Sequence, residues 1–506
     1  MIPNKIVHQR GLAVCRTLAK GNFGYIYIEP TQVFAILSAM STRFISVDRS
    51  QPFLLPPDLR EWVPEDDLVH FVIQAVESLP EGRFRVNRRG SGSAQYPPSM
   101  MLALLIYCYA NGIFSSRRIE RATHRDIAVR FLTGDTHPDH DTIAAFRREN
   151  FDVVADCFVQ VLELAKELNL LKMGTVSVDG TKMRANASKN RNVRYDRAGE
   201  LLETLRRDVQ ELIEKAERTD QLDEQDGQRL PDELSRAEAL KEKLEAARRT
   251  IEGRARARAE GERAEYERKM AERAKRKGPR GSEVKEPDAS PRPEEQTNLT
   301  DSDSRLMCKN KRSGFEQSYN AQAAVDADGS QLILGTRISQ CSADKGELEP
   351  TVRAIPEILG QPATVLADNG YLSEAQVRAL EGSGEEPAMD VLVSVHAEAK
   401  ELDRKYDFRP PPAEKEKKNR IRSEFVLEMK ERMAQEEARR KYRKRKQTVE
   451  PVFGIIKNCM GFTQFHLRGL EKVSGEWNLL ALAYNFKRLW NIMNTSKRLD
   501  SQEKPA

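Results

Sequence analysis

The spacing of apolar residues changes along the chain, and each change marks a candidate boundary. Between residues 54 and 170, short apolar groups recur at helical spacing. Residues 64–67 (Pro-Glu-Asp-Asp) place acidic side chains in the first turn of one predicted helix, where the helix dipole favours them. The apolar run at 102–110 predicts a buried helix, because it is far too short to cross a bilayer. We therefore predict a helical domain at residues 46–170.

Arginines recur on the short helical segments of this domain. The last of these segments, 140–150, follows a capping sequence at 139–142 and carries Arg147 and Arg148. Exposed arginines on several short helices are typical of a helical DNA-binding module, so we predict that Arg147 and Arg148 contact DNA. A plain helical bundle remains open as the alternative.

Strand signals begin at Thr175, and the strand-like runs are short and rich in apolar or β-branched residues. These runs are 175–178, 318–325, 331–338, 363–367 and 391–395. Residues 326–329 (Asp-Ala-Asp-Gly) separate the second and third runs and predict a β-hairpin. The pattern indicates an α/β domain at 171–494, behind the helical domain. It does not give the strand order.

A charged helical segment interrupts the strands at about 197–277. Its apolar positions recur at spacings of three and four in two runs, 202–216 and 237–251, which a polar stretch separates. This predicts two helices folded back as an antiparallel, coiled-coil-like hairpin. Residues 278–297 contain several prolines and read as a polar linker.

The two ends of the chain differ from the rest. Residues 1–39 lack a clear period, so we predict an irregular N-terminal extension at residues 1–45. Met40 opens a segment that reads like a fresh amino terminus, and either Met40 is the true start or the preceding residues form a genuine arm. We expect residues 495–506 to be a disordered tail.

Composition adds a location and a candidate partner. The six cysteines form no Cys-x-x-Cys pair, which argues against a zinc ribbon or a disulfide framework and fits a reducing cytoplasm. No signal peptide opens the chain, and no apolar run spans a membrane. The net charge of +5 says little, but residues 439–446 hold seven basic side chains in eight. Such a cluster suits a polyanion, and a solvated helix face is the alternative.

Two aspartates stand at the ends of predicted strands, Asp179 after 175–178 and Asp368 after 363–367. Ligands commonly bind at the carboxyl ends of strands, and Mg²⁺ prefers oxygen ligands. Two such ions can stabilise the attacking and leaving oxygens of phosphoryl transfer. Taken alone, each aspartate is more often a turn residue.

Glu450 supplies a third carboxylate. It follows the basic cluster directly and precedes Pro451, which is tolerated in a first helical turn, so we predict that a helix starts or restarts there. Lys457 lies two turns further on, and so on the same helix face as Glu450. A carboxylate and a lysine beside a basic run suit a metal-dependent enzyme acting on DNA. A surface Glu–Lys helix is the alternative.

Together these segments resemble the DDE-type transposases of bacterial insertion sequences, from about Phe53 to Trp490. The residues that carry the resemblance lie in short motifs spread along the chain. They are 54–57, 64–66, 117–121 and 138–142 for the helical N-terminal domain, 177–182 for the first aspartate, 298–301 and 319–322 for the second strand region, 367–371 for the second aspartate, 448–454 for the glutamate, and 468–470 with 476–477 near the end.

The resemblance implies a ribonuclease-H-like mixed sheet, with Asp179, Asp368 and Glu450 holding two Mg²⁺ ions for which Mn²⁺ substitutes. A related signature places Tyr, Arg and Lys around the glutamate, and Lys457 fits its spacing. Arg445 is one residue out of register, and Lys446 occupies the strict arginine position. Asp67 stands where a histidine is expected.

The expected partner is double-stranded DNA, both the terminal inverted repeats and the target, bound by a homodimer that pairs two ends. The residues that we expect to contact DNA near the glutamate are basic or aromatic. They are Tyr442, Arg443, Lys444, Arg445, Lys446 and Lys457. The location implied is the bacterial cytoplasm, at the nucleoid.

Three functions are compatible with these motifs. The first is an active transposase that cuts and joins DNA strands at inverted repeats. The second is a catalytically inactive or domesticated DNA-binding protein of the same family, which the presence of all three carboxylates disfavours. The third is a metal-dependent nuclease on the same fold, which would cut without joining.

Overall fold

The structure is a computed structural model in two compact units, 1–58 and 59–506. It describes residues 58–78, 84–85, 95–222, 230–275, 285–308, 314–382, 388–395 and 423–502, together with three strands before residue 58. Residues 215–222, 230–233 and 496–502 are described as backbone only. Met40, proposed above as an alternative start, lies outside the described residues.

The N-terminal unit contains a three-stranded antiparallel sheet in the order β1 (Val7–Gln9), β2 (Leu12–Ala19), β3 (Asn22–Ile28). The prediction of an irregular extension is therefore wrong for these residues. The sequence does carry a hairpin signal, because only Lys20 and Gly21 separate β2 from β3.

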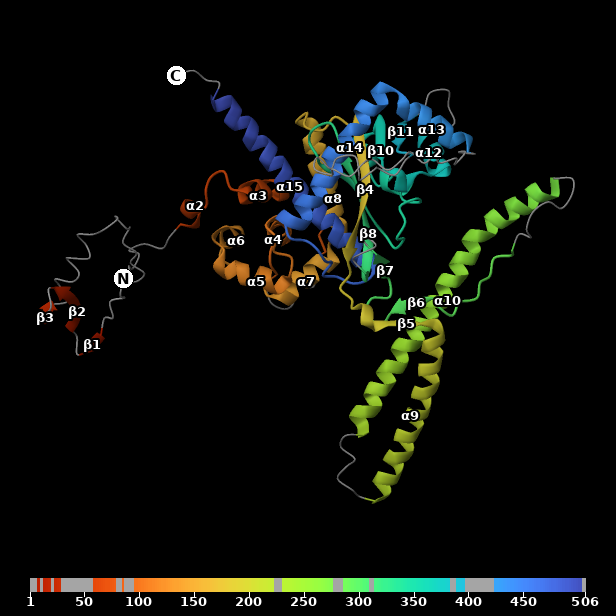
Figure 1. Ribbon diagram of the computed structural model, residues 1–506, viewed down its shortest axis with the longest axis horizontal. Helices are drawn as coiled ribbons and strands as arrows, with labels where there is room; N and C mark the ends of the chain where they lie inside the picture. Colours follow the sequence, from red (N-terminus) through yellow and green to blue (C-terminus); the bar gives the residue numbers. More distant parts are fainter. Residues whose placement is uncertain are drawn as a thin grey trace. The chain divides into compact units, whose positions relative to one another are not determined.

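The predicted N-terminal helical domain is confirmed as a set of short helices (Figure 1). They are α2 (Leu59–Trp62), α3 (Leu68–Glu77), α4 (Pro98–Ala110), α5 (Ser116–Arg125), α6 (Ile127–Leu132), α7 (His140–Glu149) and α8 (Phe151–Glu167). Local capping sets two of the starts: Asp67 accepts from the amide of Val69 at 2.8 Å, and Asp139 caps α7. Every residue of α4 from Met101 on is buried, as predicted.

The main sheet, in the predicted α/β domain, has the order β11-β10-β4-β8, with β9 and β7 both paired to β8. Its strands are β4 (Thr175–Arg184), β7 (Arg305–Cys308), β8 (Phe315–Asp326), β9 (Ile333–Ser339), β10 (Thr364–Ala367) and β11 (Asp390–Val393). β10 is parallel to β4 and β11, whereas β7 and β9 run antiparallel to β8 and β8 antiparallel to β4. This mixed sheet is consistent with the predicted ribonuclease-H-like domain, and the β8–β9 hairpin is confirmed.

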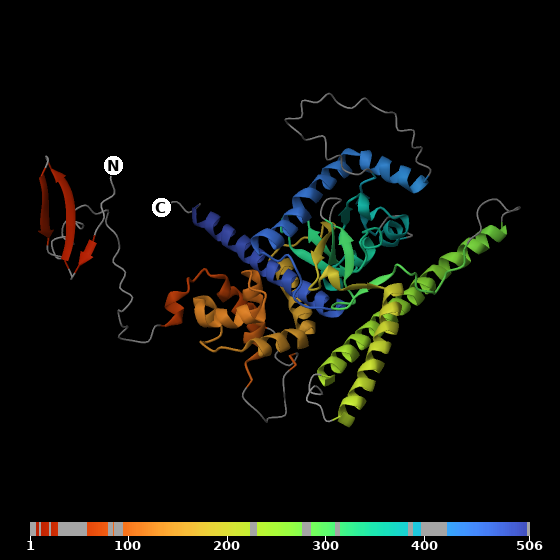
Figure 2. The ribbon, with the colours of Figure 1, turned by 60° about the horizontal axis from the view of Figure 1, so that its bottom comes forward.

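Helices cover both faces of this sheet (Figures 1 and 2). Thr336 of β9 bonds Asn478 of α15 (Leu470–Gln502), whereas the adjacent Gly335 lies against Ile355, just after α11 (Leu348–Val352). Because consecutive strand residues point to opposite faces, α15 and α11 lie on opposite sides. α15 also extends through most of the tail that was predicted to be disordered at 495–506, because it is helical as far as Gln502.

Three further helices flank the parallel side of the sheet. They are α12 (Glu374–Glu381), α13 (Glu424–Ala434) and α14 (Glu436–Gly454), and α14 continues into a π-helical turn, η6 (Ile455–Cys459). α14 packs against β4, β8 and β10. Its buried positions include Val449, Val452 and Phe453, which join the main core.

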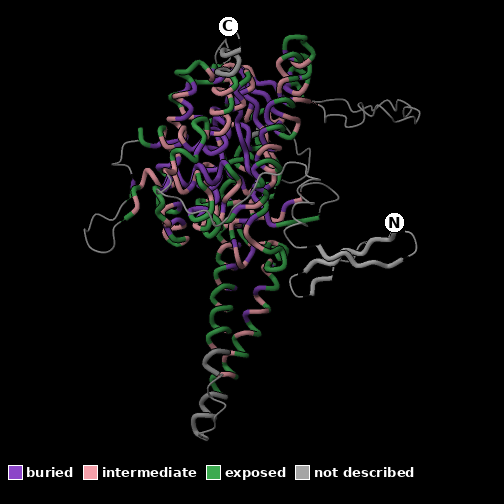
Figure 3. The backbone as a smooth tube through the Cα atoms, turned by 90° about the vertical axis from the view of Figure 1, so that its left-hand side faces the viewer, coloured by how far each residue is buried: buried purple, intermediate pink, exposed green. Residues whose placement is uncertain are grey.

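The predicted helical hairpin is present as α9 (Tyr195–Leu222) and α10 (Leu230–Lys275), which contact each other. Its base is a two-stranded sheet of β5 (Asn192–Arg194) and β6 (Gln296–Asn298), so the predicted linker ends in a strand. Figure 3 shows the hairpin largely exposed, in contrast to the buried sheet. Among the described helices, none is both long and apolar enough to cross a bilayer.

Candidate active site

Asp179 lies in the middle of β4, not at its end as predicted. The strand continues to Arg184 because its residues stay paired with β8, from Asp179↔Ala323 to Arg184↔Ser318. The residues from Thr181 on are mostly polar, so the apolar pattern in the sequence ends before the strand does. Asp179 is mostly buried, with 20% of its side chain exposed.

Asp368 directly follows β10, as predicted, and caps the 3₁₀ turn η5 (Asn369–Tyr371). Its Oδ1 accepts a hydrogen bond from the amide of Gly370 at 2.8 Å. The parallel register pairs Leu366 with Ser177, so two residues further on Asp368 comes level with Asp179. The sheet thereby brings the two aspartates to one rim.

Glu450 lies inside α14, so the prediction of a helix start at this point is wrong. Pro451 sits within the helix and lacks the N–H that would bond the carbonyl oxygen of Gln447. That oxygen instead accepts a hydrogen bond from Nε2 of Gln331 at 2.8 Å. The substitute donor lets the helix continue through Glu450, whose side chain is 55% exposed.

Arg445 links two of the three carboxylates. Its Nη1 lies 3.4 Å from Oδ2 of Asp179, and its Nη2 lies 3.7 Å from Oε1 of Glu450. Only 4% of its side chain is exposed, since it comes from the face of α14 that packs on the sheet. Arg445 is therefore a buried counter-charge, and its prediction as a DNA contact is not supported by its position.

The carboxyl of Asp179 is hard to ionise in this environment. Burial, the neighbouring charge of Asp368 and, more weakly, that of Asp344 together raise its pKa to about 7. Arg445 and the amide of Gly180 act in the opposite direction. Negative charge at this rim is thus only partly compensated.

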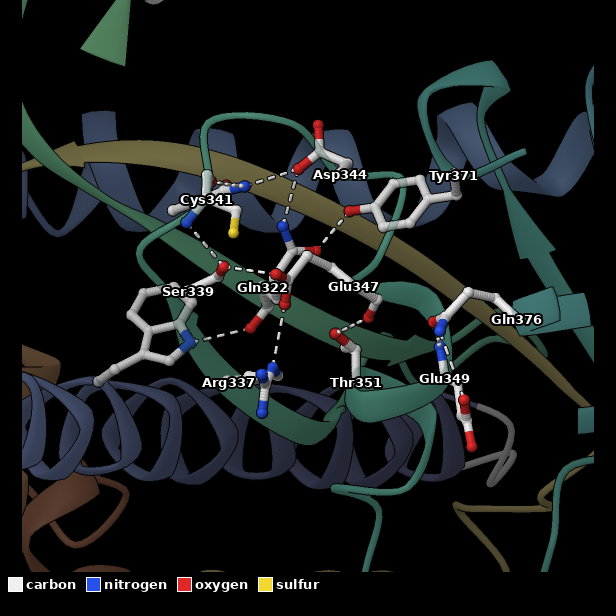
Figure 4. Close-up of polar contacts among 12 residues, drawn as sticks. Gln322, Arg337, Ser339, Cys341, Asp344, Glu347, Glu349, Thr351, Tyr371 and Gln376 are labelled. Atoms are coloured by element: carbon white, nitrogen blue, oxygen red, sulfur yellow. Dashed lines mark hydrogen bonds and ion pairs between the residues drawn. The ribbon is translucent and has the colours of Figure 1, made fainter. Parts of the chain in front are cut away.

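Asp344 is a fourth carboxylate that the sequence did not single out. Its Oδ1 accepts hydrogen bonds from Asn320 Nδ2 at 2.7 Å and Gln322 Nε2 at 2.9 Å. Tyr371 in turn donates to Oε1 of Gln322, and Figure 4 shows this network. Asp344 lies several residues beyond β9, so a search for aspartates directly at strand ends passes over it.

The residues predicted to contact DNA around Glu450 occupy different environments. Lys457 bonds Thr181 on β4, beside Asp179. Lys444 forms an ion pair with Asp328 at 2.7 Å. Tyr442 is half-buried against a small cluster that includes Leu366, with its ring 6.0 Å from the Arg445 guanidinium. Arg443 and Lys446 are exposed.

The two N-terminal arginines also differ. Arg147 is buried and donates from Nη1 to the hydroxyl of Tyr109 at 2.8 Å and to the carbonyl of Phe114 at 3.0 Å. Its prediction as an exposed DNA contact is therefore wrong. Arg148 is exposed on α7, as predicted.

The donor atoms at the rim suit a divalent cation in kind. Hard cations such as Mg²⁺ take oxygen ligands, and the repulsion that Asp368 and Asp344 exert on Asp179 is what a bound cation would relieve. Across the described part of the chain, however, no three histidine, cysteine or acidic side chains lie close enough to hold one ion. In this structure Arg445 provides the positive charge between Asp179 and Glu450.

Two protein families match parts of this chain. A family described as a transposase DDE domain matches residues 411–490, which include Glu450, Arg445 and Lys457. A second, described as a transposase domain, matches residues 57–149 in the helical region. No curated protein and no solved structure matches the chain. The two family matches support a DDE-type insertion-sequence transposase, and such a domain implies the use of divalent metal and the binding of DNA.

Proposed function

We propose that this DDE-type transposase cuts and joins DNA strands at the terminal inverted repeats of its insertion sequence, with Asp179, Asp368 and Glu450 as the catalytic carboxylates. The observation that carries the proposal is their placement. The parallel register of β4 and β10 brings Asp179 and Asp368 level, and Arg445 connects Asp179 to Glu450 on α14. This register and these two contacts of Arg445 are what support assigning the three carboxylates to one site.

The three carboxylates would hold two Mg²⁺ ions, or Mn²⁺ in their place. Such ions supply charge stabilisation for the attacking and leaving oxygens of phosphoryl transfer. Asp179 binds a cation only as a carboxylate, and its pKa of about 7 makes its ionised form dependent on pH near neutrality. Without a bound cation, Arg445 would hold Asp179 and Glu450 in place through its contacts with both carboxylates.

Basic side chains beside the carboxylates would position the DNA backbone. Lys457 comes from η6, one turn beyond the end of α14, and is held at Thr181, two residues from Asp179. Arg443 and Lys446 are exposed on α14, whereas Arg445 is buried. Contacts of this kind fix position and affinity rather than sequence choice.

The wider organisation follows the same proposal. Residues 46–170 would form a DNA-binding domain with Arg148 on its exposed surface, and 171–494 the catalytic domain. The exposed hairpin of α9 and α10, the 197–277 insertion, would join two protomers across paired DNA ends. The protein would act in the bacterial cytoplasm, at the nucleoid.

One observation keeps a second function in view. The pairing of Arg445 with two of the three carboxylates would also suit a copy that binds DNA without cutting it. A nicking assay separates the two functions. It uses a labelled duplex carrying the element's end, with Mg²⁺ or Mn²⁺, for the wild type and Asp368→Ala. Cleavage by the wild type alone supports the transposase, whereas binding without cleavage by both proteins supports the inactive copy.

A further inference from the structure

Beyond Asp179, strand β4 borders a surface recess. β4 pairs with β10 only from Thr175 to Ser177, so its later residues face other parts of the chain. There a cavity of about 280 Å³ is lined by the basic side chains of Lys182, Arg184 and Lys457. Glu316 is the acidic residue in its lining, and Thr463 and Ser318 contribute hydroxyl groups.

A second recess of about 550 Å³ continues from the end of β4. Its lining includes Arg191, Arg468, Asn186 and Gln464, with no acidic side chain among its described lining residues. The two recesses adjoin because the same two segments, 184–188 and 463–468, form their walls.

Hydrogen bonds fix these walls to each other. The amide of Phe465 donates to the carbonyl of Arg184 at 2.9 Å, and Gln464 Nε2 donates to the carbonyl of Ala185 at 3.0 Å. Asn186 Nδ2 donates to the carbonyl of His466 at 2.7 Å, and Arg468 Nε donates to the carbonyl of Asn186 at 2.9 Å. The recesses therefore lie between two segments, 184–188 and 463–468, that hydrogen bonds hold together.

Four of the five basic side chains that line these recesses form no ion pair with a carboxylate of the described residues. Lys182, Arg184, Arg191 and Arg468 make no ion pair with any carboxylate of the described chain. On α14, by contrast, Lys444 and Arg445 are both paired with aspartates. Arg184, Arg191 and Arg468 are also exposed, so they are available to an anion from solution.

We propose that Lys182, Arg184, Arg191 and Arg468 form a track, the β4 track, that binds the sugar–phosphate backbone of a DNA strand leaving the catalytic carboxylates. At about 3.3 Å per strand residue, Asp179 and Arg184 lie about 17 Å apart along β4. Side chains alternate along a strand, so Lys182 and Arg184 lie on the other face of β4 from Asp179, and the track passes over the edge that β10 leaves open beyond Ser177. Lys457 connects the two faces, because it bonds Thr181 and lines the recess with Lys182 and Arg184. That length covers about five phosphates of one strand, at about 3.4 Å each along the helix axis. Hydroxyl and amide groups such as those of Thr463, Asn186 and Gln464 are suited to phosphate oxygens.

The inference rests on the proposed function, because it takes the reacting phosphate to lie at Asp179 and Asp368. It adds the route of the strand. Backbone contacts are the same for every sequence, so the β4 track contributes affinity equally to the element's ends and to unrelated DNA.

The test measures DNA affinity of the full chain by fluorescence anisotropy as salt rises from about 50 to about 200 mM. The probes are one duplex carrying the element's end and one unrelated duplex of equal length. The variant is Lys182→Gln/Arg184→Gln/Arg468→Gln. A control of equal charge is Arg353→Gln/Arg378→Gln/Lys430→Gln, three exposed residues on other elements. A charge-retaining version, Lys182→Arg/Arg184→Lys/Arg468→Lys, checks for effects on folding.

The β4 track predicts that the triple glutamine variant binds both duplexes about tenfold or more weakly, by the same factor. The slope of log affinity against log salt becomes shallower by about three, while the control and charge-retaining variants keep the wild-type slope. An unchanged slope in the track variant, or an equal loss in the control, overturns the inference alone if Asp368-dependent cleavage persists. Absence of DNA binding by the wild type overturns the proposed function as well.

Discussion

Arg445 and Asp179, which are 266 residues apart in sequence, meet with Nη1 of the guanidinium 3.4 Å from Oδ2 of the carboxylate. The contact is mostly shielded from water, since 4% of the arginine side chain and 20% of the aspartate side chain are exposed. A buried charge that loses its partner is costly, so this pair couples the stability of the fold to the ionisation of the candidate site.

Removing the arginine tests that coupling. Arg445→Met is expected to lower the free energy of unfolding by about 3 kcal/mol at pH 8, because it leaves a buried carboxylate without its counter-charge. It also raises the pKa of Asp179 above about 7, since Arg445 normally lowers it. Urea unfolding measures the first effect. The loss shrinks at pH 5, where Asp179 is protonated in both proteins; a loss that is the same at both pH values contradicts this account.

The raised pKa of Asp179 predicts that the stability of the fold depends on pH. Its pKa is about 7 in the folded chain against an ordinary value of 3.8, so between these values the folded state holds a proton that the unfolded chain has released. Stability therefore falls as pH rises through this window. Relative to the wild type, Asp179→Asn gains stability from pH 4 to pH 8, by up to about 4 kcal/mol, at about 1.4 kcal/mol for each tenfold change in the acid constant.

The measurement is thermal or urea unfolding of both proteins at several pH values, with metal removed by a chelator. Glu357→Gln, an exposed acidic residue of the 3₁₀ turn η4 (Glu357–Leu359), is the control. A difference between Asp179→Asn and wild type that stays constant across pH would show that the pKa of Asp179 is not raised.

The neighbouring aspartates should act on Asp179 in a fixed order. Asp368 contributes more than Asp344 to the raised pKa, so Asp368→Asn lowers the pKa of Asp179 more than Asp344→Asn does. NMR titration of the Asp179 carboxyl carbon follows both variants directly. The reverse order would mean that Asp344 lies closer to Asp179 in solution than in this structure.

Gln331 is predicted to compensate for Pro451. Gln331→Ala removes the donor to the carbonyl oxygen of Gln447 and is expected to cost about 1 kcal/mol of unfolding free energy. In a Pro451→Ala background the alanine N–H takes that oxygen, so the same substitution costs close to nothing. A double-mutant cycle by urea unfolding gives the coupling, and two additive substitutions would refute it.

Arg147 and Arg148 give a matched pair of adjacent residues. Arg147→Ala is expected to destabilise the helical domain by about 3 kcal/mol, because it removes the donor to Tyr109 and Phe114 from a buried site. Arg148→Ala, at an exposed position, leaves stability unchanged within about 0.5 kcal/mol. Thermal unfolding distinguishes the two. Equal stabilities of the two variants would indicate that Arg147 is exposed, in contradiction to this structure.

Local sequence patterns predicted the elements whose causes are local. The cap at Asp139, the buried helix α4 and the β8–β9 hairpin all follow from neighbouring residues, and each is present. Asp179 and Asp368 could also be predicted from local pattern, because each directly follows a run of strand-forming residues. The predicted run at 175–178 ends too early, because β4 continues as a polar strand held by β8.

The remaining features depend on contacts between distant segments. Pro451 is typical of a helix start. The helix continues through it because Gln331, from a distant segment, supplies a donor to the carbonyl oxygen of Gln447. Arg147 is indistinguishable from Arg148 in sequence, and only the packing against Tyr109 and Phe114 buries it. Asp344 and Arg445 join the carboxylates through β8 and α14, which no periodicity relates.

If Asp179, Asp368 and Glu450 together catalyse strand joining, strand transfer requires all three side chains. A labelled duplex carrying the element's end with a free 3′-hydroxyl is incubated with target plasmid and Mg²⁺ or Mn²⁺. The proteins compared are the wild type, Asp179→Asn, Asp368→Asn, Glu450→Gln and the control Glu357→Gln. Joint catalysis by the three carboxylates predicts metal-dependent joined product with the wild type and the control, and none with the three site variants. Joined product from any of those three variants at the wild-type rate would contradict it.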